Sequence, residues 1–220
     1  MNFLFKLPLP LKERLFMFVR YLSNPFDEVV KSIIKEKNIL DIGCGHGLLE
    51  FLLSQKKFSG KITGIDPDRN KIFLARKLFK DNYRNYGFFN EKIETFVSKS
   101  LKNKKKFDCI TIIDVDYLLN INEKTKLINN VKKLLTKDGL LVMKTVVKRK
   151  TFGFYLGYLQ ELITVFLFRK TFSTESNFYF MSVEQYVMLL EQNGFEVITN
   201  KDIRKIYHYH PHHLFLAKIK

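Results

Sequence analysis

The sequence has no tryptophan and only two cysteines, Cys44 and Cys109, among its 220 residues. Two cysteines are too few for a framework of disulfides, and neither belongs to a Cys-x-x-Cys pair. The simplest setting for such a chain is a reducing one, so we expect a cytoplasmic protein.

Long apolar runs are also missing. No segment reaches the roughly 18 uninterrupted apolar residues of a membrane-spanning helix, so none is predicted. The apolar N-terminal stretch MNFLFKLPLPLKERLF is broken by two lysines and two prolines, namely Lys6, Pro8, Pro10 and Lys12. We therefore predict no secretory signal peptide.

Acidic residues are few, with 22 Asp and Glu against 38 Lys and Arg, which gives a formal net charge of +16. Such a charge is typical of proteins that bind nucleic acid or anionic membranes. The basic residues are 30 lysines and 8 arginines, whereas recognition of phosphates and bases favours the planar fork of arginine. We therefore interpret the charge mainly as a solvated basic surface.

What the sequence does contain is an alternation of strand-like and helix-like segments between residues 28 and 147. We expect strands at 38–43, 60–66, 86–90, 107–114 and 140–147, and helices at 47–57, 67–82, 93–103 and 122–139. Pro67 suits the first turn of the second helix, and Gly139 the end of the fourth. This alternation is typical of βαβ units, so the fold class is α/β with a doubly wound parallel sheet.

The C-terminal part follows a different pattern. A helix is expected at 181–195, with Ser182 as its N-cap and Gly194 at its end. Two strand-like runs follow, at 195–207 and 213–220, with no helix between them. We therefore expect this pair to be antiparallel.

The stretch NILDIGCGHGLLEF, Asn38–Phe51, places glycines on alternate positions between a strand and a helix. Ligands of open α/β sheets bind at the carboxyl ends of the strands, so this loop is a candidate binding site. A P-loop is excluded because no Gly-Lys-Ser/Thr follows. A dinucleotide-binding loop would have its third glycine at Leu48, and Asp41 would repel a pyrophosphate. The carboxylate suits a cationic ligand better.

The segment LDIGCGHG resembles motif I of the class I S-adenosylmethionine-dependent methyltransferases. The resemblance implies S-adenosylmethionine as the cofactor, since its sulfonium and ammonium match the acid in the loop. It implies cofactor contacts from Asp41, Gly43, Cys44, Gly45 and Gly47. We interpret Cys44 and His46 as spacers whose backbone matters more than their side chains.

The resemblance continues along the next strands. In ITGIDPD it implies that Asp66, followed by Pro67, binds both ribose hydroxyls, and a carboxylate can accept two hydrogen bonds from a diol. FDCITIIDVDYLL resembles motif IV and places Asp114 near the methionine part of the cofactor. The family fold is a Rossmann-like, doubly wound, mostly parallel seven-stranded sheet with a reversed last strand, expected here over residues 30–220.

One position departs from the family pattern. Where the family usually has an aspartate that contacts the adenine amino group, this sequence has Lys92, preceded by Asn90 and Glu91. A lysine has no acceptor for that amino group. Either Glu91 takes this role, or backbone groups near Ile93 hold the adenine.

The methyl acceptor is predicted from two apolar segments. An insertion at about 150–180 is almost entirely apolar from Phe152 to Phe168, between basic clusters. Residues 1–29 are expected to form an amphipathic helical cover, whose apolar stripe is Leu11, Leu15, Phe18, Val19 and Leu22. Both segments would wall a pocket for a small-molecule or lipid-like apolar acceptor, with peripheral membrane contact. The alternative is that the insertion packs as a buried helix.

The segment HYHPHHLF carries His208, His210 and His212 at alternate positions. We predict no metal site, because Pro211 interrupts the run and no carboxylate or cysteine lies nearby. The histidines are expected in the turn before the last strand, where His210 or His212 is a candidate acceptor-side base.

Two other functions remain open from the sequence. RNA is an alternative acceptor, suggested by the basic segment SKSLKNKKKF and the net charge, although no appended RNA-binding module is recognisable. The second alternative is a non-catalytic scaffold protein with the same fold, suggested by Lys92. The Asn/Asp-Pro-Pro-Tyr/Phe motif of exocyclic-amino methylases is absent from the sequence.

Overall fold

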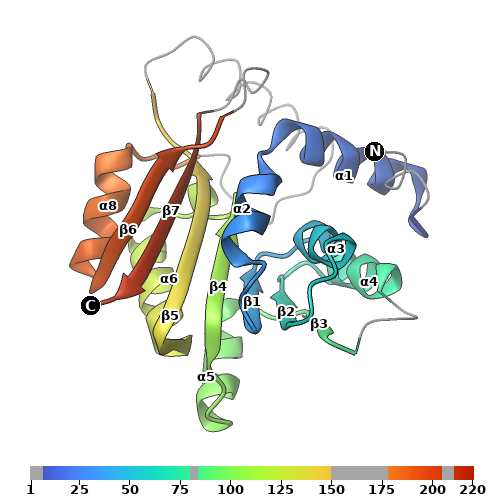
Figure 1. Cartoon of the computed structure of the whole chain (residues 1–220), viewed down its shortest axis with the longest axis horizontal. Helices are drawn as coiled ribbons and strands as arrows, with labels where there is room; N and C mark the ends of the chain where they lie inside the picture. Colours follow the sequence, from blue (N-terminus) through green and yellow to red (C-terminus); the bar gives the residue numbers. More distant parts are fainter. Residues whose placement is uncertain (1–6, 80–83, 150–177, 205–210) are drawn as a thin grey trace.

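A computed structural model describes residues 7–79, 84–149, 178–204 and 211–220. These residues form a seven-stranded sheet in the order β3-β2-β1-β4-β5-β7-β6, with helices on both faces (Figure 1). The strands are β1 Asn38–Ile42, β2 Lys61–Ile65, β3 Tyr86–Phe89, β4 Phe107–Ile113, β5 Leu135–Val146, β6 Phe195–Asp202 and β7 His212–Ile219.

The pairing of the strands confirms the predicted fold class. β1 to β5 are parallel to one another, whereas β7 runs antiparallel to both β5 and β6. The sheet is therefore mostly parallel with a reversed last strand. Because the ends of parallel strands meet at one edge, the loops after β1, β2, β3 and β4 converge there.

The helices are α1 Leu11–Ser23, α2 Phe26–Ile33, α3 Leu48–Gln55, α4 Arg69–Leu78, α5 Ile93–Lys102, the 3-10 helix η2 Asp116–Leu118, α6 Ile121–Leu134 and α8 Val183–Gln192. Two apolar cores separate them by face, with α2, α3 and α4 on one side and α5, α6 and α8 on the other. Within the described ranges, no helix is both long and apolar enough to cross a membrane.

Helix ends were predicted with mixed success. Ser182 caps α8 through a capping box with Gln185, and Gly194 follows α8 with a φ of +80°, both as predicted. Pro67 does not lie in the first turn of α4, because Asp68 is the N-cap and accepts the first backbone N–H groups. Pro67 therefore precedes the cap.

The fourth predicted helix was too long. α6 ends at Leu134 rather than Gly139, and β5 begins at the next residue. Leu135 pairs with Phe107 of β4, and the register then shifts to Leu140 opposite Cys109. Residues 135–139, which we predicted as the end of a helix, therefore belong to a strand that is held by long-range pairing.

The N-terminal segment is divided between two roles. The boundary that we expected between residues 29 and 30 falls inside α2, whose Phe26, Val29, Val30 and Ile33 are buried in the core. α1 instead lies at the end of the sheet where β5 finishes (Figure 1). The insertion expected at about 150–180 lies almost entirely outside the described residues.

Candidate functional site

The glycine loop after β1 is fixed to the end of β2. The backbone N–H groups of Gly43 and Cys44 both donate to the carbonyl of Ile65, at 2.8 and 3.1 Å. The φ angles of Gly43, Gly45 and Gly47 are +79°, +56° and +79°. In this left-handed region a side chain is strained, so the loop conformation itself requires the glycines.

The space around the three glycines differs. A Cβ atom at Gly43 would lie 2.3 Å from the Cγ2 atom of Val115, and one at Gly47 would lie 3.3 Å from two phenylalanine rings. A Cβ atom at Gly45 would meet no atom of the described residues within 4 Å. A ligand can therefore approach the backbone at Gly45, which fits the cofactor that the sequence implies.

Asp66 stands directly beside this opening. Its Oδ2 atom accepts the backbone N–H of Gly45 at 3.1 Å, and its Oδ1 atom accepts that of Asp68 at 2.8 Å. Burial raises the pKa of Asp66, against the charge of Lys71 and these two hydrogen bonds. Each carboxylate oxygen has a second lone pair, so Asp66 can also accept from a diol.

Asp41 is buried in β1, with 3% of its surface exposed. The hydroxyl of Thr111 in β4 donates to its Oδ1 atom at 2.5 Å. Burial raises the pKa of Asp41 to about 7; the charge of Asp66 adds to this rise, whereas the Thr111 hydrogen bond and Arg20 oppose it. A bound cation would favour the carboxylate form of Asp41.

Glu50 is a buried acid that the sequence interpretation missed. It lies in α3, is fully buried, and neither carboxylate oxygen has a hydrogen-bond partner among the described residues. Burial and the charge of Asp41 raise the pKa of Glu50 well above its ordinary value, which favours its protonated, neutral form. Its place inside the apolar run LLEFLL was the available signal.

The loop after β3 holds the end of β2 in place. The side-chain amide of Asn90 donates to the carbonyls of Asp66 and Pro67, at 3.1 and 2.8 Å. Asn90 thus fixes the backbone that presents the Asp66 carboxylate. Pro67 contributes to the site through its carbonyl group.

Glu91 and Lys92 lie where the family pattern usually has the aspartate that contacts the adenine. Lys92 is the N-cap residue of α5, which Ile93 begins, and its side chain is exposed. The Oε1 atom of Glu91 accepts from Lys99 at 2.8 Å, whereas its Oε2 atom is buried without a hydrogen-bond partner among the described residues. Glu91 therefore offers the acceptor that Lys92 lacks.

Asp114 follows β4 and forms an ion pair at the adjacent strand end. It has a φ of +55°, and Lys144 of β5 donates to both of its carboxylate oxygens, at 2.8 and 2.6 Å. Arg20 of α1 lies 3.6 Å from the same carboxylate, and Lys144 also donates to Asn24. Lys144 is 1% exposed, and a lysine inside the apolar run LLVMKTVV was a signal of this pairing.

His46 links the glycine loop to α1. Its Nε2 atom lies 2.9 Å from Oε2 of Glu13, and its ring centroid lies 5.4 Å from that of Phe16. The interpretation of His46 as a spacer was therefore wrong. Cys44 keeps its side chain buried, and burial raises the pKa of its thiol, so the thiol is neutral.

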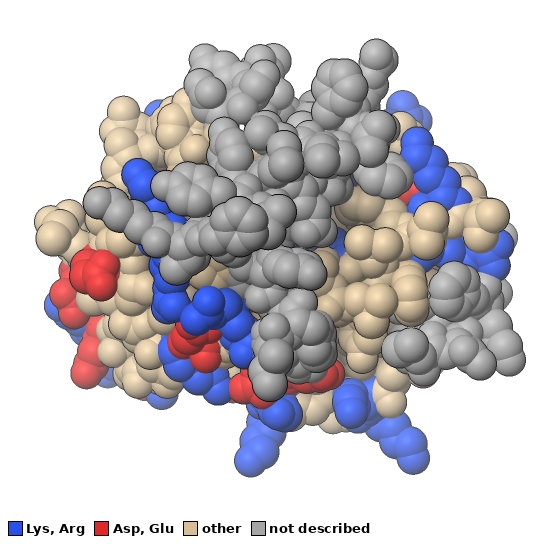
Figure 2. All heavy atoms as spheres, turned by 90° about the horizontal axis from the view of Figure 1, so that it is seen from above, with Lys and Arg blue, Asp and Glu red and all other residues tan. Residues whose placement is uncertain are grey.

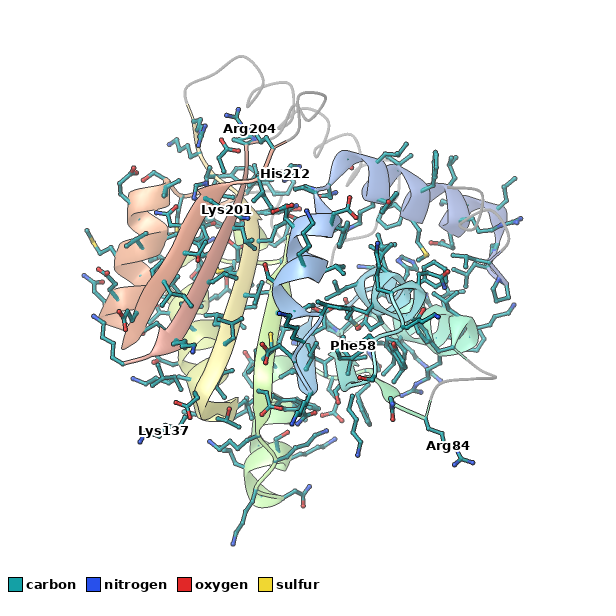
Figure 3. The ribbon with its side chains drawn as sticks, viewed as in Figure 1. Phe58, Arg84, Lys137, Lys201, Arg204 and His212 are labelled. Atoms are coloured by element: carbon teal, nitrogen blue, oxygen red, sulfur yellow. The ribbon has the colours of Figure 1, made fainter. Side chains whose placement is uncertain are left out.

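The candidate base His212 lies within β7 rather than in the turn before it. It pairs with Val146 of β5, and its Nε2 atom is 2.9 Å from the carbonyl of Ser23 at the end of α1. Figure 3 shows His212 at the same end of the sheet as Arg204. His208 and His210 lie outside the described residues. Among the residues that are described, no group of three or more His, Cys, Asp or Glu side chains could hold a metal ion.

Comparisons with known proteins agree with this geometry. A family described as "Methyltransferase domain" matches residues 33–210. The ubiquinone biosynthesis O-methyltransferase of Glaesserella parasuis is 32% identical over 111 residues, which are 50% of this chain and 45% of that protein. The protein of the same name from Coxiella burnetii is 28% identical over 179 residues, which are 81% of this chain and 70% of that protein. The chain thus spans less than half the length of the first of these relatives.

A solved structure shares the fold. Magnesium protoporphyrin IX methyltransferase from Synechocystis PCC 6803, determined with bound S-adenosylmethionine, superposes with a TM-score of 0.62. The match covers 89% of this chain and 78% of that one, at 15% sequence identity. Since the family match extends over most of the sequence and the fold agrees with the class I resemblance, the chain belongs to the family of methyltransferase domains.

Proposed function

We propose that this protein transfers a methyl group from S-adenosylmethionine to a small apolar acceptor. The observation that carries the proposal is the open side of Gly45, whose backbone N–H is bonded to the buried carboxylate of Asp66. This pairing presents a side-chain-free backbone and a diol acceptor at one strand edge. The family of the chain supports the same chemistry.

Different residues of the chain would contact different parts of the cofactor. Gly43, Gly45 and Gly47, with the backbone of Cys44, would shape the loop against it. Asp66 would accept from the ribose, and Pro67 would fix the backbone next to it. Glu91 would accept from the adenine amino group, beside Lys92 and Ile93 at the start of α5. Asp41 would supply negative charge toward its cationic methionine part, and Asp114, paired with Lys144, would lie near that part.

S-adenosylmethionine, when bound, supplies a methyl group on a positively charged sulfur. The protein's part is to position the acceptor in line and exclude water, which can account for most of the acceleration of such a displacement. A base is needed only if the acceptor must lose a proton. The Nε2 atom of His212 faces the carbonyl of Ser23 and therefore carries the proton of the neutral ring. Its Nδ1 atom is then the nitrogen able to accept one, and His210 remains the second candidate.

The finer proposal is that the acceptor is lipid-like. The relatives named above are ubiquinone biosynthesis O-methyltransferases, which supports a small hydroxylated acceptor. The apolar sequence at about 150–180 supports a long apolar part on it. RNA and the scaffold role are the outcomes against which the proposal is tested.

The cofactor is tested by thermal unfolding with S-adenosylmethionine, S-adenosylhomocysteine, NAD⁺ or no ligand. A ligand at 100 times its Kd stabilises the native state by about 2.7 kcal/mol, which is about 5–10 °C in Tm for a chain of this size. We expect this rise with the two sulfur nucleosides and not with NAD⁺. Asp66→Ala should remove most of it.

The matched control is Asp138→Ala, the same substitution at an exposed position in β5. Its neighbour Lys137 lies at the opposite edge of the sheet from His212 (Figure 3), so the ligand shifts should be unchanged. Acceptors are then compared by transfer of a labelled methyl group to a long-chain phenol, its short-chain counterpart and RNA. Faster labelling of RNA, or no ligand shift in the unmodified protein, would refute the proposed function.

A further inference from the structure

The outer face of α1 is apolar, which is the reverse of the usual arrangement for a surface helix. Its exposed residues are Leu11, Leu15, Val19 and Leu22, at 66%, 49%, 47% and 40% exposure, together with Lys12. Positions spaced by three or four residues share one face of a helix. We expected this stripe to face the acceptor pocket, but among its members Phe18 alone turns inward, against the core.

The charged side chains of α1 explain why the helix is turned this way. Glu13 pairs with His46 in the glycine loop, and Arg20 with Asp114 after β4. Both partners lie beyond the carboxyl ends of strands, so these two contacts hold α1 across the candidate site. Glu13 is the only acidic residue of α1. The outer face of this helix, every residue of which is described, therefore exposes aliphatic side chains and a lysine but no acid.

The charge of the whole molecule favours one kind of partner for such a face. The formal net charge of +16 attracts anionic surfaces. Figure 2 views the molecule from the end where α1 lies; among the described atoms it shows uncharged surface beside lysine and arginine side chains in the right half of the view. A helix of 13 residues is about 20 Å long and can lie flat at the boundary between lipid headgroups and acyl chains.

We propose that α1 docks this protein on an anionic lipid bilayer, with Leu11, Leu15, Val19 and Leu22 inserted and Lys12 at the headgroups. This inference rests on the proposed function, because a docked bilayer would supply the apolar acceptor directly to the site that α1 covers. It also explains the inward-facing Glu13 and Arg20. They hold the helix with its apolar face outward.

The test is flotation of the full chain with two kinds of vesicle. One kind contains phosphatidylglycerol mixed with phosphatidylcholine, and the other contains phosphatidylcholine alone. We expect binding to the anionic vesicles that weakens with added salt. Leu15→Asp combined with Val19→Asp should weaken this binding roughly tenfold or more, since two aliphatic side chains no longer enter the bilayer.

The matched control is Met188→Asp combined with Ile198→Asp. It adds the same charge at two exposed apolar positions, on α8 and β6, and should bind vesicles within about twofold of the unmodified protein. Equal binding to both kinds of vesicle, or unchanged binding of the α1 variant, overturns the proposal. So does a dimer of the unmodified protein that the α1 variant converts to a monomer without any vesicle binding.

Two further measurements keep the result separate from folding and from the cofactor. The α1 variant should keep its Tm and the rise produced by S-adenosylhomocysteine, which shows that it is folded with an intact site. If the ligand shift is absent from every form while anionic vesicles still bind, the proposed function fails and the docking surface stands. If the ligand shift is present and no vesicle binds, the docking proposal fails alone.

Discussion

Three buried carboxyl groups surround the glycine loop, and they differ in how their hydrogen-bonding capacity is used. Asp66 accepts hydrogen bonds from two backbone N–H groups, and Asp41 accepts one from a hydroxyl group. Glu50 has no partner among the described residues and lies against Gly64, whose added Cβ would be 2.7 Å from its Oε1 atom. A buried acid without partners destabilises the native state, most strongly when it must ionise. Glu50 is thus a local cost in stability at the edge of the site.

We predict that Glu50→Met stabilises the protein by about 1–3 kcal/mol at neutral pH, because an apolar side chain of similar size replaces an unsatisfied buried carboxyl group. The pKa of Glu50 is raised in the native state, so native protein holds the proton more tightly than unfolded protein does. Stability of the unmodified protein therefore falls as pH rises above the ordinary pKa of 4.5. The gain from the substitution should accordingly grow as the pH is raised from about 5 through neutral.

Urea unfolding of both proteins across this pH range measures the effect. Glu94→Met, at an exposed position of α5, is the control and should change stability by less than about 0.5 kcal/mol. A gain that is independent of pH would show that Glu50 does not retain its proton in the native state.

At this scale, the predictable residues were those whose role follows from position along the chain. Asp66 ends a strand at a recognisable distance from the glycines, and the loop brings it to Gly45. The contacts of the His46 and Lys144 side chains were missed because their partners come from distant segments. Asn24, for example, is 120 residues from Lys144. The sequence carried only the indirect signal of a lysine in an apolar run.

At the scale of elements, the ends of β4 and β5 are joined by the ion pair of Asp114 and Lys144. Both side chains are at most 4% exposed, and Arg20 adds α1 to the same cluster. A buried ion pair adds little net stability compared with apolar residues, but removing one partner leaves a charge without compensation. This cluster therefore fixes how two strands and the covering helix meet.

We predict that Lys144→Met destabilises the protein by about 3–5 kcal/mol, because among the described cations Asp114 then keeps only the more distant Arg20. Adding Asp114→Asn should recover a large part of this loss, since asparagine tolerates the positive φ at this position and carries no charge. Chemical unfolding of the single and double variants measures both values. Equal stability of the two variants would contradict the uncompensated charge as the cause.

Elements were predicted well in type and less well at their ends. The alternation of strands and helices is a local pattern of apolar residues, and it predicted the strands of the parallel region. The predicted end of α6 was wrong because Leu135 pairs with Phe107 in β4, a contact that local signals cannot reveal. Likewise, the stripe on α1 was recognised, but its direction depends on Glu13 and Arg20 finding partners in other elements.

At the scale of the whole molecule, the seven-stranded, mostly parallel sheet with its reversed last strand was predictable because the family pattern extends over most of the chain. The distribution of charge was not, since it depends on which lysines face solvent. Charges of one sign on a compact surface repel one another and destabilise the folded state. With a formal net charge of +16, this repulsion acts on the molecule as a whole.

We predict that added NaCl stabilises the unliganded protein, with Tm rising between about 0.01 and 0.15 M, because the Debye length falls from about 30 to about 8 Å. Salt weakens repulsion between exposed lysines, whereas the buried pair of Asp114 and Lys144 is screened much less. Lys137→Glu, at an exposed position away from the site, should raise Tm at low salt and reduce its further rise. A Tm that falls with salt would mean that surface ion pairs, such as those of Glu28 with Lys31 and Lys201, outweigh the repulsion.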